Sequence, residues 1–208
     1  GQNVGTTQTH AANAAAADLG LYYQNKLNID LPSEYAFGLQ ISNLGTKISY
    51  SDNMESSFLP ANLRLGGRYT MDFDQFNNLS LMVDLNKLLV PTPPVYNEDG
   101  SIYAGMDPNV GILQGAIQSF YDAPNGLKEE MQEISLSVGA EYWYNKVLAV
   151  RAGYFYEAKN KGARQYLTVG AGLRYNVMGL DISYLISTSA LSNNPLKNTL
   201  RIALTFDL

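Results

Sequence analysis

The strongest constraint in this sequence is an alternation of apolar residues with small or polar ones, repeating every second residue. Between residues 166 and 175, Leu167 and Leu173 fall on one face of an extended strand, whereas Thr168 and Arg174 fall on the other. Side chains of a strand point alternately to opposite faces, while those of a helix repeat every 3.6 residues. The segment is therefore predicted to be a β-strand with one apolar face.

The same alternation recurs in other segments, so the sequence predicts about nine strands. The others lie at residues 15–23, 35–41, 63–71, 79–85, 134–142, 148–156, 180–186 and 200–208. The first is the weakest because it is rich in alanine, a poor strand residue. Most of them approach the length of about 9–11 residues that a tilted membrane-spanning strand needs.

The connections between these strands alternate in length. The short turns lie at 72–78, 145–146 and 176–179, and the longer links at 43–62, 87–130, 158–165 and 188–198. Short turns on one side and long loops on the other are typical of outer-membrane barrels. A soluble β-sandwich does not usually sort its loops in this way. The pattern therefore favours an all-β, transmembrane antiparallel β-barrel.

Charged residues gather on the strand faces opposite the apolar ones. Besides Asp18, they are Arg64, Arg68, Asp84, Glu141, Arg151, Arg174, Asp181 and Arg201. These faces otherwise carry Gly, Ser and Thr, not the many lysines of a sheet that faces water. We expect them to line a crowded lumen braced by ion pairs. The apolar faces would meet lipid, where an arginine near the midplane costs roughly 2–4 kcal/mol.

Nine is an odd number of strands, whereas single-chain bacterial barrels have even strand counts. The last segment carries Phe206 two residues before its end and resembles the terminal strand of an outer-membrane barrel. If that end is periplasmic, the short turns are periplasmic, the long loops are external and the first strand also runs inward. We therefore expect residues 1–208 to form the C-terminal part of one larger barrel.

The loop at 87–130 is the candidate functional element, since loops longer than about 12–15 residues are usually functional or disordered. Its start, 88–96, is apolar and stiffened by prolines. Residues 97–100 are predicted to form a hairpin turn, and they lack the ligand spacing of a calcium loop. Residues 109–121 are predicted to contain a short amphipathic helix. Its apolar face either covers the barrel mouth or binds a protein partner.

Six residues of this loop are predicted to contact a partner. They combine aromatic side chains with a stiff backbone, which lowers the ordering cost of binding. They are Pro93, Pro94, Val95, Tyr96, Phe120 and Tyr121.

Composition argues against several classes of function. There is no Cys, which removes disulfides, zinc–thiolate sites and thiol catalysis. The single histidine, His10, argues against multi-histidine metal sites and a Ser–His pair. The net charge of −5 has the wrong sign for nucleic-acid binding. We predict no enzyme activity, cofactor, metal or nucleic-acid partner, and interpret Glu129 and Glu130 as a solvated turn.

Several stretches resemble the PorV (LptO) family. The resemblance covers most of residues 14–208 and is most specific in the long loop. The stretches are Asp18–Tyr23, Tyr35–Leu39, Ile41–Gly45, Asn62–Gly67, Asn86–Pro94, Gln118–Pro124, Lys128–Glu133 and Arg151–Tyr154.

This resemblance implies a function. PorV proteins are outer-membrane components of the type IX secretion system of Bacteroidota, built on a FadL-like barrel of 14 strands, of which this chain would be the last nine. By resemblance, the chain binds the translocon SprA (Sov), takes cargo proteins with a C-terminal sorting domain and delivers them to the PorU attachment complex. It would lie in the cell outer membrane, in contact with outer-membrane lipid.

Three other functions remain as alternatives. A FadL-like transporter of hydrophobic small molecules needs an apolar lumen, which the small and polar inward faces disfavour. A lipase or lipid A deacylase needs a base beside its serine, and His10 lies in the N-terminal tail. A soluble β-protein is disfavoured by the scarcity of lysine on the polar faces and by the sorted loops.

Overall fold

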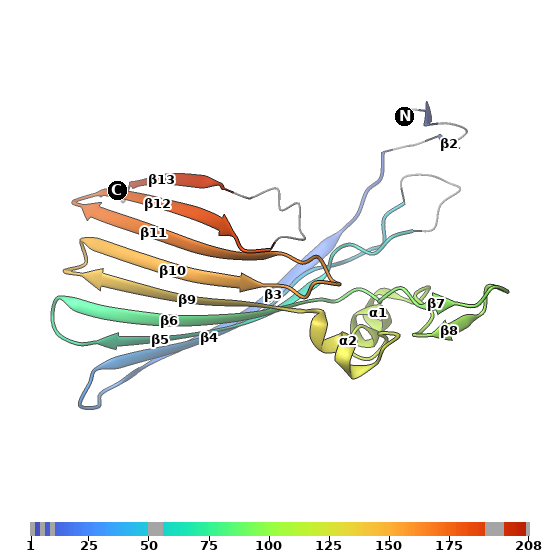
Figure 1. The fold of residues 1–208 in the computed structure, drawn as a ribbon, viewed down its shortest axis with the longest axis horizontal. Coiled ribbons are helices and arrows are strands. Elements are labelled where there is room, and N and C mark those ends of the chain that lie inside the picture. Colours follow the sequence, from blue (N-terminus) through green and yellow to red (C-terminus); the bar gives the residue numbers. More distant parts are fainter. Residues whose placement is uncertain (1–2, 5–6, 9–10, 50–55, 190–197, 207–208) are drawn as a thin grey trace. The chain divides into compact units, whose positions relative to one another are not determined.

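The computed structural model describes residues 3–4, 7–8, 11–49, 56–189 and 198–206 (Figure 1). His10 and the end of the last predicted strand, 207–208, lie outside the described residues. The described chain is all-β apart from two short helices, which confirms the predicted fold class. None of the described helices is both long and apolar enough to cross a membrane.

The chain divides into two compact units, and strands β3 to β6 contribute residues to both. One unit comprises Gly1–Leu21, Gln40–Arg64 and Lys87–Glu133. The other comprises Tyr22–Leu39, Leu65–Asn86 and Ile134–Leu208. The long loop therefore belongs to the first unit, and strands β9 to β13 belong to the second.

The main sheet contains nine strands in the order β13-β12-β11-β10-β9-β6-β5-β4-β3. The prediction of about nine strands is thus confirmed. In the described part of the chain β3 and β13 are edge strands, so the sheet is open. The strands are β3 Ala16–Leu27, β4 Ser33–Gly45, β5 Asn62–Asp72, β6 Asn77–Leu88, β9 Ile134–Tyr144, β10 Leu148–Tyr156, β11 Gln165–Tyr175, β12 Met178–Ser187 and β13 Leu200–Phe206.

The predicted alternation between two faces is visible in the burial of β11. Leu167 and Leu173 are exposed, whereas Thr168 and Arg174 are half-buried and Gly172 is buried. Strands β9 to β13 pair antiparallel without a register shift. One face of this sheet is therefore apolar and exposed, and the other is polar and partly buried.

The short turns follow from local backbone chemistry. Residues 145–147 join β9 to β10. Asn145 and Lys146 have φ of 52° and 56°, and the Val147 N–H donates to the Tyr144 carbonyl at 3.0 Å, as in a type I′ turn. Asn176, with φ of 50°, begins a two-residue turn, because β11 ends at Tyr175 and β12 starts at Met178. In the third turn, Asp74 Oδ1 accepts hydrogen bonds from the backbone N–H groups of Phe76 (2.7 Å) and Asn77 (2.8 Å).

The long loop contains the expected hairpin and helix. Strand β7 (Val95–Tyr96) pairs antiparallel with β8 (Ile102–Ala104), and helix α1 spans Ile112–Gln118. A second helix, α2 (Leu127–Gln132), was not predicted. The remaining pair is β1 (Asn3–Val4) with β2 (Thr7–Gln8). Around the loop, Ala61, Leu89 and Ala116 form a small buried core, with Ile41, Leu44 and Leu63 packed against it.

Candidate functional site

A buried lysine connects the two ends of the long loop. Lys87 Nζ donates hydrogen bonds to Glu130 Oε2 (3.0 Å) and to Glu133 Oε2 (2.7 Å). The side chains of Lys87 and Glu130 are each only 7% exposed. The prediction of a solvated turn at Glu129 and Glu130 was therefore wrong for Glu130, because α2 places this carboxylate on a buried cation.

Further hydrogen bonds connect the middle of the loop to Glu130 and Glu133. Thr92 donates from its hydroxyl to Glu133 Oε1 (2.7 Å) and from its backbone N–H to Asp122 Oδ2 (3.0 Å). The backbone N–H of Ala123 donates to Glu130 Oε1 (2.8 Å). We call Lys87, Thr92, Asp122, Glu130 and Glu133 the anchor cluster.

The charges of the anchor cluster do not balance. The cluster contains one lysine and three carboxyl groups, and Asp122 is 1% exposed. Its Oδ1 atom is buried and has no hydrogen-bond partner within the described residues. Burial raises the pKa of Asp122 above its ordinary value, and the negative charge of Glu130 raises it further, against hydrogen bonds from Thr92 and Gln118 that lower it.

The anchored loop exposes most of the residues that were predicted to contact a partner. Tyr96 is 54%, Phe120 48% and Tyr121 59% exposed, and Val95 and Pro93 are exposed as well. Pro94 differs, because it is buried. It packs so closely over the backbone of Gly105 that a Cβ atom there would lie 3.1 Å from Pro94. Its ring therefore supports the loop and is not accessible to a partner.

The exposed surface is larger than predicted. Leu113, Ile117 and Tyr121 follow one another at intervals of four residues along α1 and its end, and all three are exposed. Leu127 and Met131 do the same on α2. A helix that packs on a core buries its large apolar residues, whereas α1 buries the small ones, Gly115 and Ala116. The i, i+4 spacing of these large residues was visible in the sequence.

We call this set the loop surface. It consists of large apolar side chains contributed by the β7–β8 hairpin and by both helices. Its members are Val95, Tyr96, Ile102, Tyr103, Leu113, Ile117, Phe120, Tyr121, Leu127 and Met131.

On the polar face of the sheet, four strands contribute to one ion network. Arg151 donates hydrogen bonds to Glu141 and, at 2.6 Å, to Asp181. Arg174 donates to the other oxygen of Asp181 at 2.8 Å. Both guanidinium groups lie over the ring of Trp143, at 5.4 and 5.5 Å from its centroid. Two arginines and two carboxylates therefore form a neutral network.

Gly172 makes room for this network. A Cβ atom at this position would lie 2.5 Å from Asp181 Oδ1 and 2.8 Å from Arg151 Nη1. Both distances are shorter than a carbon atom tolerates, so a larger residue would displace the ion pair.

The other charged residues of these faces differ in their pairing. Arg68 pairs with Glu34 at 2.5 Å, a partner that the sequence pattern did not reveal. Arg64, Asp84 and Arg201 are exposed and form no ion pair with the described residues. Five of the eight charged residues therefore form ion pairs: Arg68, Glu141, Arg151, Arg174 and Asp181. That they line a lumen stays a prediction.

Comparison with known families supports the resemblance seen in the sequence. The family model described as "Type IX secretion system protein PorV" matches residues 2–95. This match covers somewhat less than half of the chain. The matched part contains strands β3 to β6 and two residues of the anchor cluster, Lys87 and Thr92. No curated protein matches the chain.

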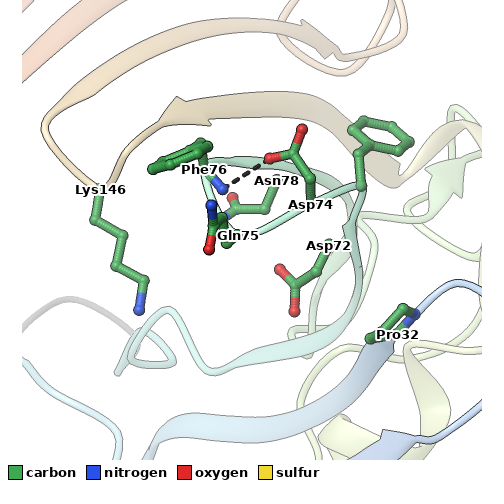
Figure 2. A pocket seen from close by; sticks show the side chains of 8 residues that line it. Pro32, Asp72, Asp74, Gln75, Phe76, Asn78 and Lys146 are labelled. Carbon is green, nitrogen blue, oxygen red and sulfur yellow. Dashed lines mark hydrogen bonds between the residues drawn. The ribbon is translucent and has the colours of Figure 1, made fainter.

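A hollow of the chain lies at the short turns (Figure 2). Its volume is about 490 Å³, and its lining includes the 72–78 turn, Pro32 and Lys146. Figure 2 shows the side chains of Lys146 and Asp72 extending toward this hollow. Hydrogen bonds from Asn77 and from the Phe76 backbone hold the pKa of Asp74 below its usual range, so this carboxylate stabilises the turn.

The residues around this hollow are mainly acidic, amide and aromatic. The lining contains no hydroxyl, thiol or imidazole group. Within the described ranges, no group of three or more His, Cys, Asp or Glu side chains is arranged to hold a metal ion. The lining therefore does not hold a Ser–His or Cys–His pair.

Proposed function

We propose that this chain is a non-enzymatic outer-membrane component of the type IX secretion system. In this proposal, its external loop binds secreted proteins that carry a C-terminal sorting domain. Binding takes place at the translocon SprA (Sov), and the cargo is then delivered to the PorU attachment complex at the cell surface. The observation that carries the proposal is the loop surface, in a chain whose residues 2–95 match the PorV family.

The loop is suited to binding because it combines exposed apolar side chains with internal anchoring. The anchor cluster joins its first, middle and last segments through buried hydrogen bonds. A surface that is already ordered loses little conformational entropy when a partner binds. Aromatic side chains are enriched at protein interfaces, and Tyr is among the residues that contribute most to binding.

The membrane location in this proposal is supported by the two faces of the sheet. On β10, β11 and β12 the exposed positions are apolar, while the charged residues Arg151, Arg174 and Asp181 lie on the other face. This distribution suits a wall between lipid and a polar interior. The proposal includes residues 1–208 as the C-terminal part of one transmembrane β-barrel in the outer membrane of a Gram-negative member of the Bacteroidota.

A photo-crosslinking amino acid placed at individual loop positions tests this proposal in the native outer membrane. We expect crosslinks from positions 96 and 121, both on the loop surface, to SprA or to proteins with the sorting domain. Tyr175 is the control, because it is a tyrosine at a short turn that is 73% exposed, more than either loop tyrosine. Crosslinks to these partners from position 175 but from neither loop position would contradict the proposal.

Side-chain removal provides a second test. We expect Tyr96→Ala combined with Phe120→Ala to reduce partner recovery while membrane insertion is kept. Because Phe120 lies 5.7 Å from Lys87 Nζ, the pair Tyr96→Ala with Tyr121→Ala serves as a variant that leaves the anchor cluster intact. Full partner recovery by both double variants would show that the loop surface is not the binding site.

The alternative of a transporter for hydrophobic small molecules has less support. Such a transporter needs an apolar path through the barrel, whereas the ion network of Arg151, Arg174, Glu141 and Asp181 occupies the polar face of the sheet. No described contact favours an apolar ligand on that face.

A further inference from the structure

The apolar face of the sheet contains a notch with a glycine at its floor. Gly67 on β5 stands where its neighbours on the same face carry large side chains. A cavity of about 340 Å³ opens above it, lined by Tyr35, Phe37, Tyr69, Leu81 and Val83, with contributions from Arg68 and Met82. We call this cavity the Gly67 notch.

The walls of the Gly67 notch are aromatic and regularly arranged. The rings of Tyr35 and Phe37 lie 5.7 Å apart on β4, and the ring of Tyr23 on β3 continues the row at 6.0 Å from Tyr35. Arg68 contributes to the lining, but its guanidinium is paired with Glu34. No unpaired charge is therefore available to a ligand in the notch.

The polarity of the notch changes along the strands. Tyr35 and Tyr69 lie near the ends of β4 and β5 that join short turns, and Asn25 donates a weak hydrogen bond of 3.5 Å to the Tyr35 hydroxyl. Phe37, Gly67 and Val83 lie farther from those turns. The notch thus has hydroxyl groups at the end near the short turns and only apolar groups at its other end.

We propose that the Gly67 notch binds one acyl chain of a phospholipid. This inference rests on the proposed function, because it requires the apolar face to lie in a bilayer. An amphiphile matches the polarity of the notch: its chain contacts Phe37 and Val83, and its ester region meets the tyrosine hydroxyls. The strand backbones are paired within the sheet, so they offer few hydrogen bonds to a polar ligand.

The geometry at Gly67 allows the notch to be filled without breaking the strand. A Cβ atom there would lie 3.7 Å from Val83 Cγ1 and 3.9 Å from Phe37 Cδ1, which are ordinary van der Waals distances. Gly67→Ala is therefore expected to fold normally and to keep most of the cavity. Gly67→Leu is expected to fill the cavity and exclude the chain.

Native mass spectrometry of the full chain with dimyristoyl phosphatidylethanolamine tests the inference. The protein is purified from the outer membrane in mild detergent. The matched control is Ala171→Leu, which adds the same side chain to an exposed position on the apolar side of β11. We expect the unaltered protein, Gly67→Ala and Ala171→Leu to retain one lipid after weakly bound lipid is stripped, and Gly67→Leu to retain none.

Three outcomes would overturn the inference. One is retention of the lipid by Gly67→Leu, and another is the absence of a retained lipid on an unaltered protein that is inserted in the outer membrane. The third is loss of a co-purifying membrane protein from Gly67→Leu with the lipid count unchanged, which would assign the notch to a protein contact. If Gly67→Leu fails to fold, Val83→Trp fills the notch from β6.

Membrane insertion is measured separately for each protein, from its fractionation and from the change in gel migration on heating. If the unaltered protein is absent from the outer membrane, the proposed function fails. If it is inserted but retains no lipid, only the inference about the notch fails.

Discussion

At the scale of single residues, Lys87 carries the largest energetic consequence. It is buried with two carboxylates as its partners, one from α2 and one just beyond it. Taking away one partner of a buried ion pair costs far more than the pair contributes as a whole, because the remaining charges stay buried without compensation.

We predict that Lys87→Met lowers the free energy of loop opening by about 3–5 kcal/mol, the range observed for broken buried ion pairs. Hydrogen exchange of the amides in residues 88–133 measures this change. Lys128→Met is the matched control, since Lys128 is an exposed lysine of the same loop. Equal exchange in the two variants would show that the anchor cluster does not order the loop.

The raised pKa of Asp122 predicts that the stability of the folded loop depends on pH. Its pKa is raised in the folded loop, so the folded loop binds this proton more tightly than the open loop does. The stability that this proton contributes is complete below the ordinary carboxyl pKa and is lost as the pH rises through the raised value. Thr92, Gln118 and Glu130 are the groups that act on Asp122, and they stay in place in the test.

We predict that protection of the loop amides from hydrogen exchange decreases as the pH rises from the ordinary carboxyl pKa through the raised pKa of Asp122. The Asp122→Asn variant is expected to show a smaller decrease. Hydrogen exchange measured at a series of pH values, corrected for the intrinsic pH dependence of exchange, compares the two. The same slope in both proteins would show that Asp122 does not control the pH dependence of the loop.

At the scale of elements, the ion network connects four neighbouring strands by side chains. Strands β9, β10, β11 and β12 each contribute one charged member: Glu141, Arg151, Arg174 and Asp181. These side chains are 24–31% exposed, so solvent screens the interaction and its contribution is moderate.

We predict that Arg151→Met destabilises the sheet by about 1–2 kcal/mol, because it leaves Glu141 without this partner and Asp181 with Arg174 alone. Arg201→Met on β13 removes an arginine that has no ion pair among the described residues, and it is expected to cost much less. Urea unfolding of the detergent-solubilised protein compares the two variants. A larger loss for Arg201→Met would contradict the structural role of the network.

The elements also show what could be predicted from the sequence. All nine long strands were predictable, because the alternation of a half-buried strand is a local pattern within about ten residues. The β7–β8 hairpin and α1 were predictable for the same reason. Helix α2 was missed even though Leu127 and Met131 have helical spacing, because the adjacent Glu129 and Glu130 suggested a solvated segment.

The anchor cluster could not be predicted from local pattern at all. Lys87 lies 43 and 46 positions from its two partners in the sequence, and neither periodicity nor composition relates such distant residues. The pairing of Arg68 with Glu34 was missed for the same reason. The burial of Pro94 could not be predicted either. Pro94 packs against Gly105, which lies beyond the β7–β8 hairpin, and a local pattern does not relate these two residues.

At the scale of the whole molecule, each unit contributes a different part of the proposed function. One unit holds an ordered loop with a large apolar surface, and the other holds a sheet with one apolar and one charged face. The PorV match covers the four strands β3 to β6 and the beginning of the loop. The central claim is therefore that this chain binds other components of the type IX secretion system through its loop.

Affinity purification of the tagged protein from its own outer membrane, in mild detergent and followed by mass spectrometry, tests that claim most directly. Our account predicts recovery of a very large β-barrel translocon, or of secreted proteins that share a C-terminal domain. It also predicts that the Tyr96→Ala, Tyr121→Ala variant loses them. Recovery of the chain alone, with fatty acid or lipid bound in its interior, would contradict the account and favour a transporter of hydrophobic molecules.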